Sequence, residues 1–92
     1  MIHVYIATGE GTDDEESIDG FDLPSVPRIG ETIYISYARM LYPNQEGKWT
    51  DDAIEHAKRF NGTRWKVVSV WWEACIDGDG RCTVYVTKEP EP

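Results

Sequence analysis

The chain has 92 residues, of which 40% are hydrophobic, and its formal net charge is −8 at pH 7. This length allows one domain with a small core, and the acidity argues against direct nucleic-acid binding, which needs lysine and arginine to neutralise phosphates. No apolar run approaches the roughly 20 residues that span a membrane, and the start of the chain lacks a signal peptide's features, so we expect a cytoplasmic protein with no membrane partner.

The first predicted strand covers residues 2 to 8, where apolar and more polar side chains alternate. An acidic segment, residues 9 to 22, follows this strand and carries seven acidic side chains. No lysine or arginine occurs before Arg28, so the charge through residue 27 is −7 and the rest of the chain contributes −1. Because the acidic segment has few apolar residues, we expect it to be a flexible loop.

The next part of the chain is predicted to be extended. Two prolines impose an extended course on residues 21 to 30. In such a segment Leu23, Val26 and Ile29 can cover a core without pairing in a sheet. Residues 31 to 39 alternate again, which predicts a second strand.

Residues 51 to 60 carry the clearest helix signal. Thr50 is a favourable N-cap, acidic residues occupy the first turn, basic residues occupy the last turn, and Asn61 with Gly62 ends the helix. The apolar stripe is narrow and consists of Ala53, Ile54, Ala57 and Phe60. We therefore expect a short helix inserted between strands and packed on a sheet or barrel edge.

Residues 64 to 76 and 81 to 88 predict two strands of a hairpin, joined by the turn sequence Asp77-Gly-Asp-Gly80. In the expected register Cys75 faces Cys82. Two states of this pair are open: reduced thiols, which a reducing cytosol favours, or a disulfide.

Adjacent tryptophans in the first hairpin strand must point to opposite faces of the sheet. The same expected register places Trp72 beside Tyr85 on one face and Trp71 on the other. Either the helix or residues 21 to 30 cover Trp72, or Trp72, Tyr85 and Tyr34 form an exposed aromatic patch suited to a partner.

The sequence shows no pattern typical of catalysis. It has no Ser-His-Asp or Cys-His arrangement and no glycine-rich phosphate loop. The two cysteines and two histidines are too widely spaced for a structural zinc site, and the turn at Asp77 and Asp79 lacks the further ligands of a calcium loop. We expect a non-enzyme without a metal or cofactor.

Three segments resemble small uncharacterised bacterial and phage proteins. They are Leu23-Pro-Ser-Val-Pro-Arg-Ile-Gly-Glu31, which matches an "LPxVPRxGE" entry to a barrel strand, Trp65-Lys-Val-Val-Ser-Val-Trp71, and Thr83-Val-Tyr-Val86. The resemblance implies a small SH3-like barrel. It identifies a fold, and no functional residue transfers from it.

Together these patterns predict an α+β protein with a single domain over residues 1–92. Its expected core is a small antiparallel SH3-like barrel or strongly bent sheet of four or five strands, with one short helix inserted at about 51–60. The acidic segment at about 9–22 is the expected flexible loop, and residues 89–92 are an expected frayed tail.

The expected function is non-enzymatic protein binding. A phage or mobile-element protein with this acidic segment would modulate or inhibit a host protein by engaging its basic surface, including one that binds nucleic acid. The predicted contact residues are Asp13, Asp14, Glu15, Glu16, Asp19, Trp72 and Tyr85. Such a protein would be a monomer or a weak homo-oligomer. The alternative is an assembly protein that homo-oligomerises through its aromatic sheet face or a strand edge.

Overall fold

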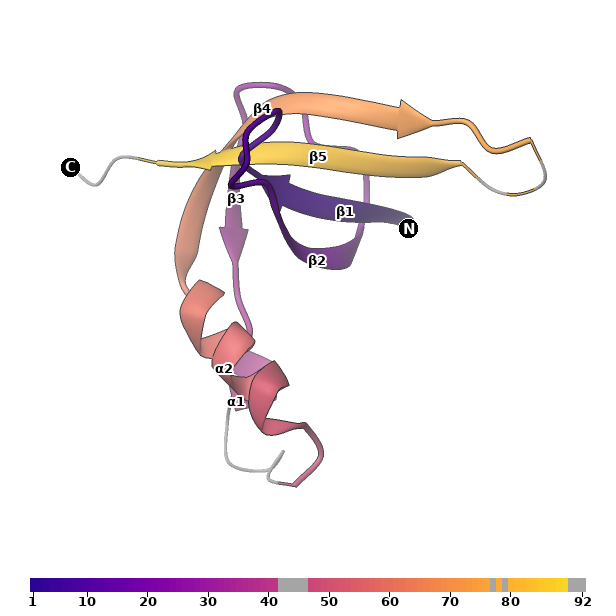
Figure 1. Ribbon diagram of the computed structural model, residues 1–92. Coiled ribbons are helices and arrows are strands. Elements are labelled where there is room, and N and C mark those ends of the chain that lie inside the picture. Colours follow the sequence, from indigo (N-terminus) through magenta and orange to yellow (C-terminus); the bar gives the residue numbers. More distant parts are fainter. Residues whose placement is uncertain (42–46, 77, 79, 90–92) are drawn as a thin grey trace. The chain divides into compact units, whose positions relative to one another are not determined.

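The computed structural model describes residues 1–41, 47–76, 78 and 80–89. Within these residues the chain forms five strands and two helices (Figure 1). They are β1 (Ile2–Thr8), β2 (Glu16–Leu23), β3 (Thr32–Ile35), α1 (Ala38–Leu41), α2 (Asp51–Phe60), β4 (Thr63–Glu73) and β5 (Arg81–Lys88). The strand order in the sheet is β2-β1-β5-β4-β3.

The sheet is curled into a half-barrel, and the expected small α+β, SH3-like fold is confirmed. It is mixed rather than wholly antiparallel. Strand β1 pairs antiparallel with β2 and parallel with β5, whereas β4 and β5 are antiparallel. A parallel pair needs a long crossover connection, and the chain between β1 and β5 provides one because it contains all the other elements.

Contacts divide the chain into two compact units. The sheet unit comprises Met1–Ile33 and Trp65–Pro92, and the helical unit comprises Tyr34–Arg64. Their compositions differ sharply. The sheet unit has 13 acidic and 4 basic residues, whereas the helical unit has 4 acidic and 5 basic residues. The charge is therefore −9 in the sheet unit and +1 in the helical unit.

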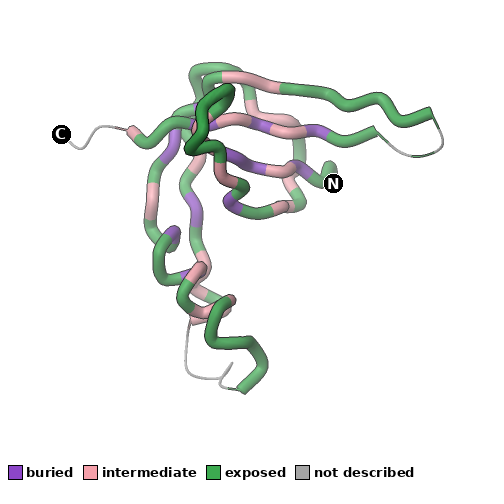
Figure 2. Tube along the Cα trace, in the orientation of Figure 1, coloured by how far each residue is buried: buried purple, intermediate pink, exposed green. Residues whose placement is uncertain are grey.

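One face of the sheet unit is a core of mostly β-branched side chains. Strand alternation in β1 turns Val4 and Ile6 toward this core and Tyr5 away from it. Figure 2 shows the buried positions recurring along the strands. The buried hydrophobic residues of this unit other than Ala7 are Val4, Ile6, Ile18, Trp65, Val67, Cys82, Val84 and Val86. Ala7 is also buried, but it pairs with Tyr85 on the opposite face of the sheet.

The second half of the acidic segment is a strand, so the prediction of a flexible loop is wrong for residues 16 to 22. This stretch belongs to β2, pairs with β1 and buries Ile18 to 3% exposure. The sparse apolar residues suggested a loop because strand formation here depends on pairing with β1, which satisfies the backbone hydrogen bonds. Residues 9 to 15 remain a connection between β1 and β2, and we call them the acidic loop.

Residues 21 to 30 differ in part from their prediction. Leu23 is the last residue of β2 and pairs with Ile2, so the expectation that it lies outside the sheet is wrong. Leu23 and Val26 are half-buried, but Ile29 is 68% exposed and does not cover the core.

Strand β3 ends at Ile35, so the predicted strand at residues 31 to 39 is too long. The chain turns into the one-turn helix α1, which local alternation did not reveal.

The helix prediction is confirmed in the helical unit. Helix α2 spans Asp51–Phe60, and the Thr50 side chain accepts a hydrogen bond from the Ala53 backbone N–H at 3.2 Å. Ala57 and Phe60 are its buried residues. The local capping and charge signals were sufficient because they act within one turn of each helix end.

The predicted hairpin register is wrong. Cys82 pairs with Trp72, three residues before the predicted partner Cys75. Strand β4 ends at Glu73 and β5 begins at Arg81, so a longer connection replaces the short turn. The predicted turn residues Asp77 and Asp79 lie outside the described residues, as do residues 42–46 and 90–92.

The register difference changes which side chains share a face. A shift by an odd number of residues moves a strand's side chains to the opposite face relative to its partner. Tyr85 therefore pairs with Ser69 and lies on the face of Trp71, and Trp72 points to the other side. An irregularity between Val67 and Ser69 changes the pairing once more toward the start of β4.

Candidate functional site

The candidate site lies on the face of the sheet unit opposite its core, which we call the open face. Strand pairing brings three strands together there: Tyr5 pairs with Thr83, and Thr83 also pairs with Trp71. Directly paired residues project to the same side of a sheet. The open face consists of Tyr5, Ala7, Trp71, Arg81, Thr83 and Tyr85.

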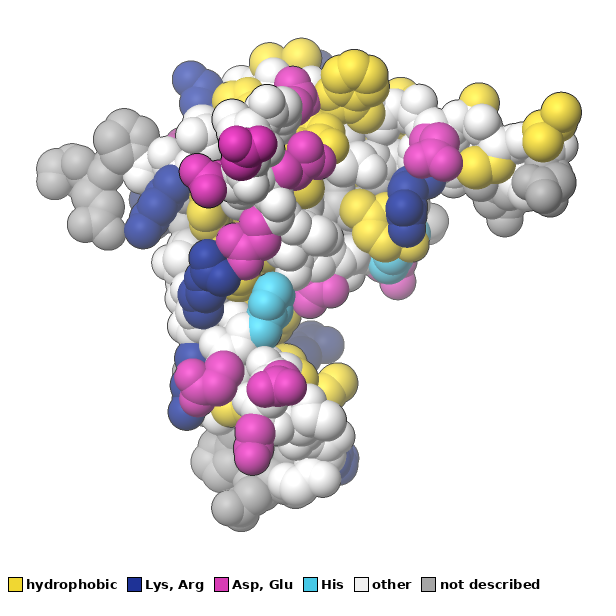
Figure 3. Space-filling view, in the orientation of Figure 1, with side chains coloured by type: hydrophobic (Ala, Val, Ile, Leu, Met, Phe, Trp, Pro, Cys, Tyr) yellow, Lys and Arg dark blue, Asp and Glu magenta, His cyan; other side chains and the backbone are white. Residues whose placement is uncertain are grey.

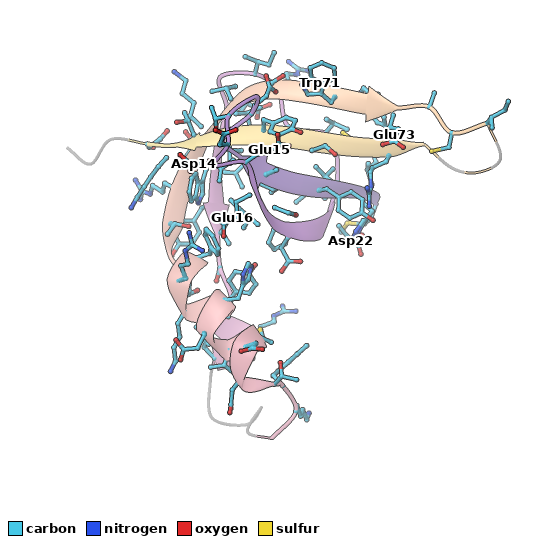
Figure 4. All side chains as sticks on the ribbon, viewed as in Figure 1. Asp14, Glu15, Glu16, Asp22, Trp71 and Glu73 are labelled. Carbon is cyan, nitrogen blue, oxygen red and sulfur yellow. The ribbon has the colours of Figure 1, made fainter. Side chains whose placement is uncertain are left out.

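Two carboxylates of the acidic loop contact aromatic side chains of the open face. Figure 4 labels Glu15 in the loop and Trp71 on β4. The Trp71 indole N–H donates to Glu10 Oε2 at 2.8 Å, and the Tyr85 hydroxyl donates to Glu15 Oε1 at 2.7 Å. The two donors lie on different strands, β4 and β5. The loop is therefore tied to the sheet at two points rather than carried as a separate negative arm.

Turn geometry within the acidic loop positions these carboxylates. The Thr12 backbone N–H donates to the Gly9 carbonyl at 3.0 Å, and the Glu15 N–H donates to the Thr12 carbonyl at 3.3 Å. Gly9 has φ +78°, a left-handed conformation that residues with a side chain rarely adopt. The chain thus folds back on itself and returns Glu15 to the start of β2.

The Tyr85–Glu15 contact also changes the acidity of the phenol. The hydrogen bond to Glu15 raises the pKa of Tyr85 above its usual value, and partial desolvation and the negative charges of Glu15 and Glu10 raise it further. Tyr85 therefore remains a neutral hydrogen-bond donor at physiological pH.

Two shallow grooves cross the open face, and Tyr5 and Arg81 line both of them. The first has a volume of ≈ 400 Å³ and includes Glu15 and Tyr85 in its lining. The second has a volume of ≈ 350 Å³ and includes His3 and Glu73. The Arg81 guanidinium lies 4.2 Å from the centroid of the Tyr5 ring, so this stacked pair stands between the two grooves.

The predicted contact residues occupy different surroundings. Asp13 and Asp14 are exposed in the acidic loop, and Glu15 bonds to Tyr85. Glu16 and Asp19 belong to β2, where the Asp19 carboxylate accepts a hydrogen bond from the Gly20 N–H at 2.8 Å. The structure thus brings Glu15 and Tyr85 together, but the acidic residues do not form one mobile cluster.

Both adjacent tryptophans are exposed, Trp71 by 57% and Trp72 by 63%. The prediction that Trp72 shares a patch with Tyr85 is wrong, because Trp71 takes that place in the observed register. Figure 3 shows acidic side chains beside hydrophobic ones on the sheet unit.

Sequence reasoning missed Glu10, Trp71, Tyr5 and Arg81 as members of this site. Only the position of Tyr5 had a local signal, since it alternates with buried Val4 and Ile6 in β1. The others required the correct pairing of β4 with β5 and the docked position of the acidic loop.

The described residues of the site contain no evident metal centre. Among the described residues, no group of three or more histidine, cysteine, aspartate or glutamate side chains is arranged to hold a metal ion.

Cys75 and Cys82 are free thiols, the first exposed and the second buried, and burial raises the pKa of the Cys82 thiol. No helix in the described part of the chain is long and apolar enough to cross a membrane.

We compared the chain with protein-family models, with curated proteins and with solved structures, and none of the three comparisons found a match. The resemblance to small bacterial and phage proteins therefore stays a prediction. What the geometry offers is an acidic, aromatic face with shallow grooves.

Proposed function

We propose that this protein is a non-enzymatic binding module that engages a basic segment of a partner protein on its open face. The observation that carries the proposal is the placement of carboxylates directly against exposed aromatic rings, at Glu10–Trp71 and Glu15–Tyr85. Aromatic side chains supply contact area and carboxylates supply charge complementarity, which together suit a protein interface. Modulation of a host protein by a phage or mobile-element protein is the form of this function that we favour.

The charge distribution supports a basic partner. The sheet unit carries −9, and the acidic loop places the exposed Asp13 and Asp14 beside the anchored Glu10 and Glu15. Such a field attracts lysine- and arginine-rich segments and speeds their association. It also repels nucleic acid and anionic membrane surfaces, so a protein is the favoured partner.

An affinity pull-down from lysate at low and high salt tests this function. The tagged wild type is compared with Trp71→Ala and with a loop variant, Asp13→Asn with Asp14→Asn. A matched control, Asp52→Asn with Glu55→Gln, removes the same charge from the exposed side of α2. We expect one basic protein to be retained by the wild type and the control. It should be lost from Trp71→Ala, from the loop variant, and at high salt, where exposed charges are screened.

Recovery of the same proteins by all four forms at both salt concentrations would contradict the proposal. It would mean that neither the acidic loop nor Trp71 contributes to recognition. Purifying the recovered protein and repeating the comparison with two components then establishes whether the contact is direct.

A second candidate function is self-assembly, favoured by apolar side chains outside the open face. Trp72 is 63% exposed on the other side of β4, and Ile76 is fully exposed in the connection to β5. This function predicts a mass that rises with protein concentration and a return to the monomer in Trp72→Ala. Sedimentation equilibrium measures both, and a constant monomer mass in the wild type excludes this alternative.

A further inference from the structure

One aromatic ring of the open face already holds a cation from the same chain. We propose that the groove between Tyr5 and Tyr85 binds an arginine side chain of the partner, and that Arg81 is an internal competitor for this position. The inference rests on the proposed function, since it names the side chain by which a basic partner is recognised. It adds a specific site and an inhibitory role for one residue.

The stacking of Arg81 on Tyr5 indicates which chemical group the groove accepts. The distance of 4.2 Å from the guanidinium carbon to the ring centroid is within the range of a cation–π contact. Arg81 is exposed, and such contacts at exposed sites are weak. A second guanidinium can therefore replace it without disrupting the sheet.

The groove supplies a counter-charge next to the ring. Glu15 lines the ≈ 400 Å³ groove together with Tyr5 and Tyr85, and its Oε1 accepts the Tyr85 hydroxyl. A carboxylate has two oxygens and about four acceptor positions, so Glu15 can bind a guanidinium while it keeps Tyr85. A planar guanidinium suits this combination of a ring face and a carboxylate better than an ammonium does.

Movement of Arg81 would enlarge the site. Tyr5 and Arg81 line both grooves, so the Arg81 side chain separates the groove that contains Glu15 from the one that contains Glu73. Displacing it exposes the ring of Tyr5 and leaves a carboxylate on either side. An anionic ligand would face both carboxylates, whereas an arginine finds complementary charge.

The test uses two blocked peptides, one of alternating arginine and glycine and one of alternating lysine and glycine. Calorimetry gives their affinities, and amide chemical shifts of the labelled full chain locate them. We expect the arginine peptide to bind more tightly and to shift the amides of Tyr5, Arg81 and Tyr85. Arg81→Met should tighten its binding by about two- to fivefold, the range that a weak cation–π competitor implies.

Three variants distinguish binding of the arginine peptide at this site from attraction of the peptide by the net charge of the protein. Lys88→Met removes the same charge from the exposed end of β5 and should change the affinity less than Arg81→Met. Tyr5→Phe keeps the ring and should retain binding, whereas Tyr5→Leu should lose most of it. The amide spectrum of each variant reports whether the sheet is intact.

Equal effects of Arg81→Met and Lys88→Met, or weaker binding by Arg81→Met, would overturn the inference. So would shifts that map away from Tyr5 and Tyr85. If binding then remained salt-sensitive and dependent on the acidic loop, the proposed function would stand without this site. Failure of the wild type and Arg81→Met to bind either peptide would count against both.

Discussion

Replacing Ile6 with alanine is expected to lower the free energy of unfolding by about 2–5 kcal/mol. Ile6 is 1% exposed in β1, which lies between β2 and β5, and it pairs with the fully buried Val84. Truncation removes buried apolar area and leaves a cavity that the flanking strands cannot close. For a small domain with a typical total stability of about 5–15 kcal/mol this is a large fraction.

Urea unfolding followed by tryptophan fluorescence measures this change, with the denaturant slope expected to stay constant. Ile29→Ala is the matched control, because it makes the same substitution at a position that is 68% exposed. We expect that control to change the stability by less than about 0.5 kcal/mol. Equal losses in the two variants would mean that the core does not contain Ile6 as described.

Replacing Gly9 with alanine is expected to cost about 1–3 kcal/mol and to displace the acidic loop. Gly9 has φ +78°, and an added Cβ would lie 2.7 Å from the Asp14 carbonyl oxygen. That contact is with backbone, so a side-chain rotation cannot relieve it. The loop must shift, and the contacts of Glu10 with Trp71 and Glu15 with Tyr85 should be lost with it.

Gly11→Ala separates the steric clash from the backbone preference. Gly11 has a similar φ of +73°, but an added Cβ there meets nothing within 4 Å. We expect Gly11→Ala to be destabilising only through the cost of holding alanine in a left-handed backbone conformation. The amide signals of Trp71 and Tyr85 should stay in place. Equal effects of the two substitutions on stability and on these signals would show that the loop is not packed as described.

The loop geometry connects stability with recognition. The same turn that places Glu15 against Tyr85 also places a carboxylate at the groove lined by Tyr5. A loop displaced by Gly9→Ala should therefore weaken binding of the arginine peptide even though no charge is removed. This variant separates the effect of the carboxylate's position on peptide affinity from the effect of the protein's net charge.

Much of the candidate site depended on distant contacts. The acidic composition identified Glu15 as a contact residue, and the aromatic content identified Tyr85, but only the structure shows that the two are bonded. Trp72 was expected beside Tyr85, and Trp71 is found on that face instead. The composition cannot distinguish two neighbouring tryptophans. The length of the β4–β5 connection sets the register of the two strands, and the register decides which tryptophan faces the site.

The sequence by itself determined the elements whose signals are local. Alternation in β1 and the capping of α2 by Thr50 act over a few residues, so their bounds could be read directly. The α+β class followed from these elements and from the strand-rich C-terminal half.

Only the tertiary structure decided the existence of β2, the register of β4 with β5 and the docking of the acidic loop. Each of these depends on a partner outside the element itself: β1 for β2, β5 for β4, and the aromatic rings of Trp71 and Tyr85 for the loop. A strand takes its hydrogen bonds from its neighbour, and an odd change in register exchanges its two faces. The chemistry of the open face is therefore a property of strand pairing that local sequence patterns do not contain.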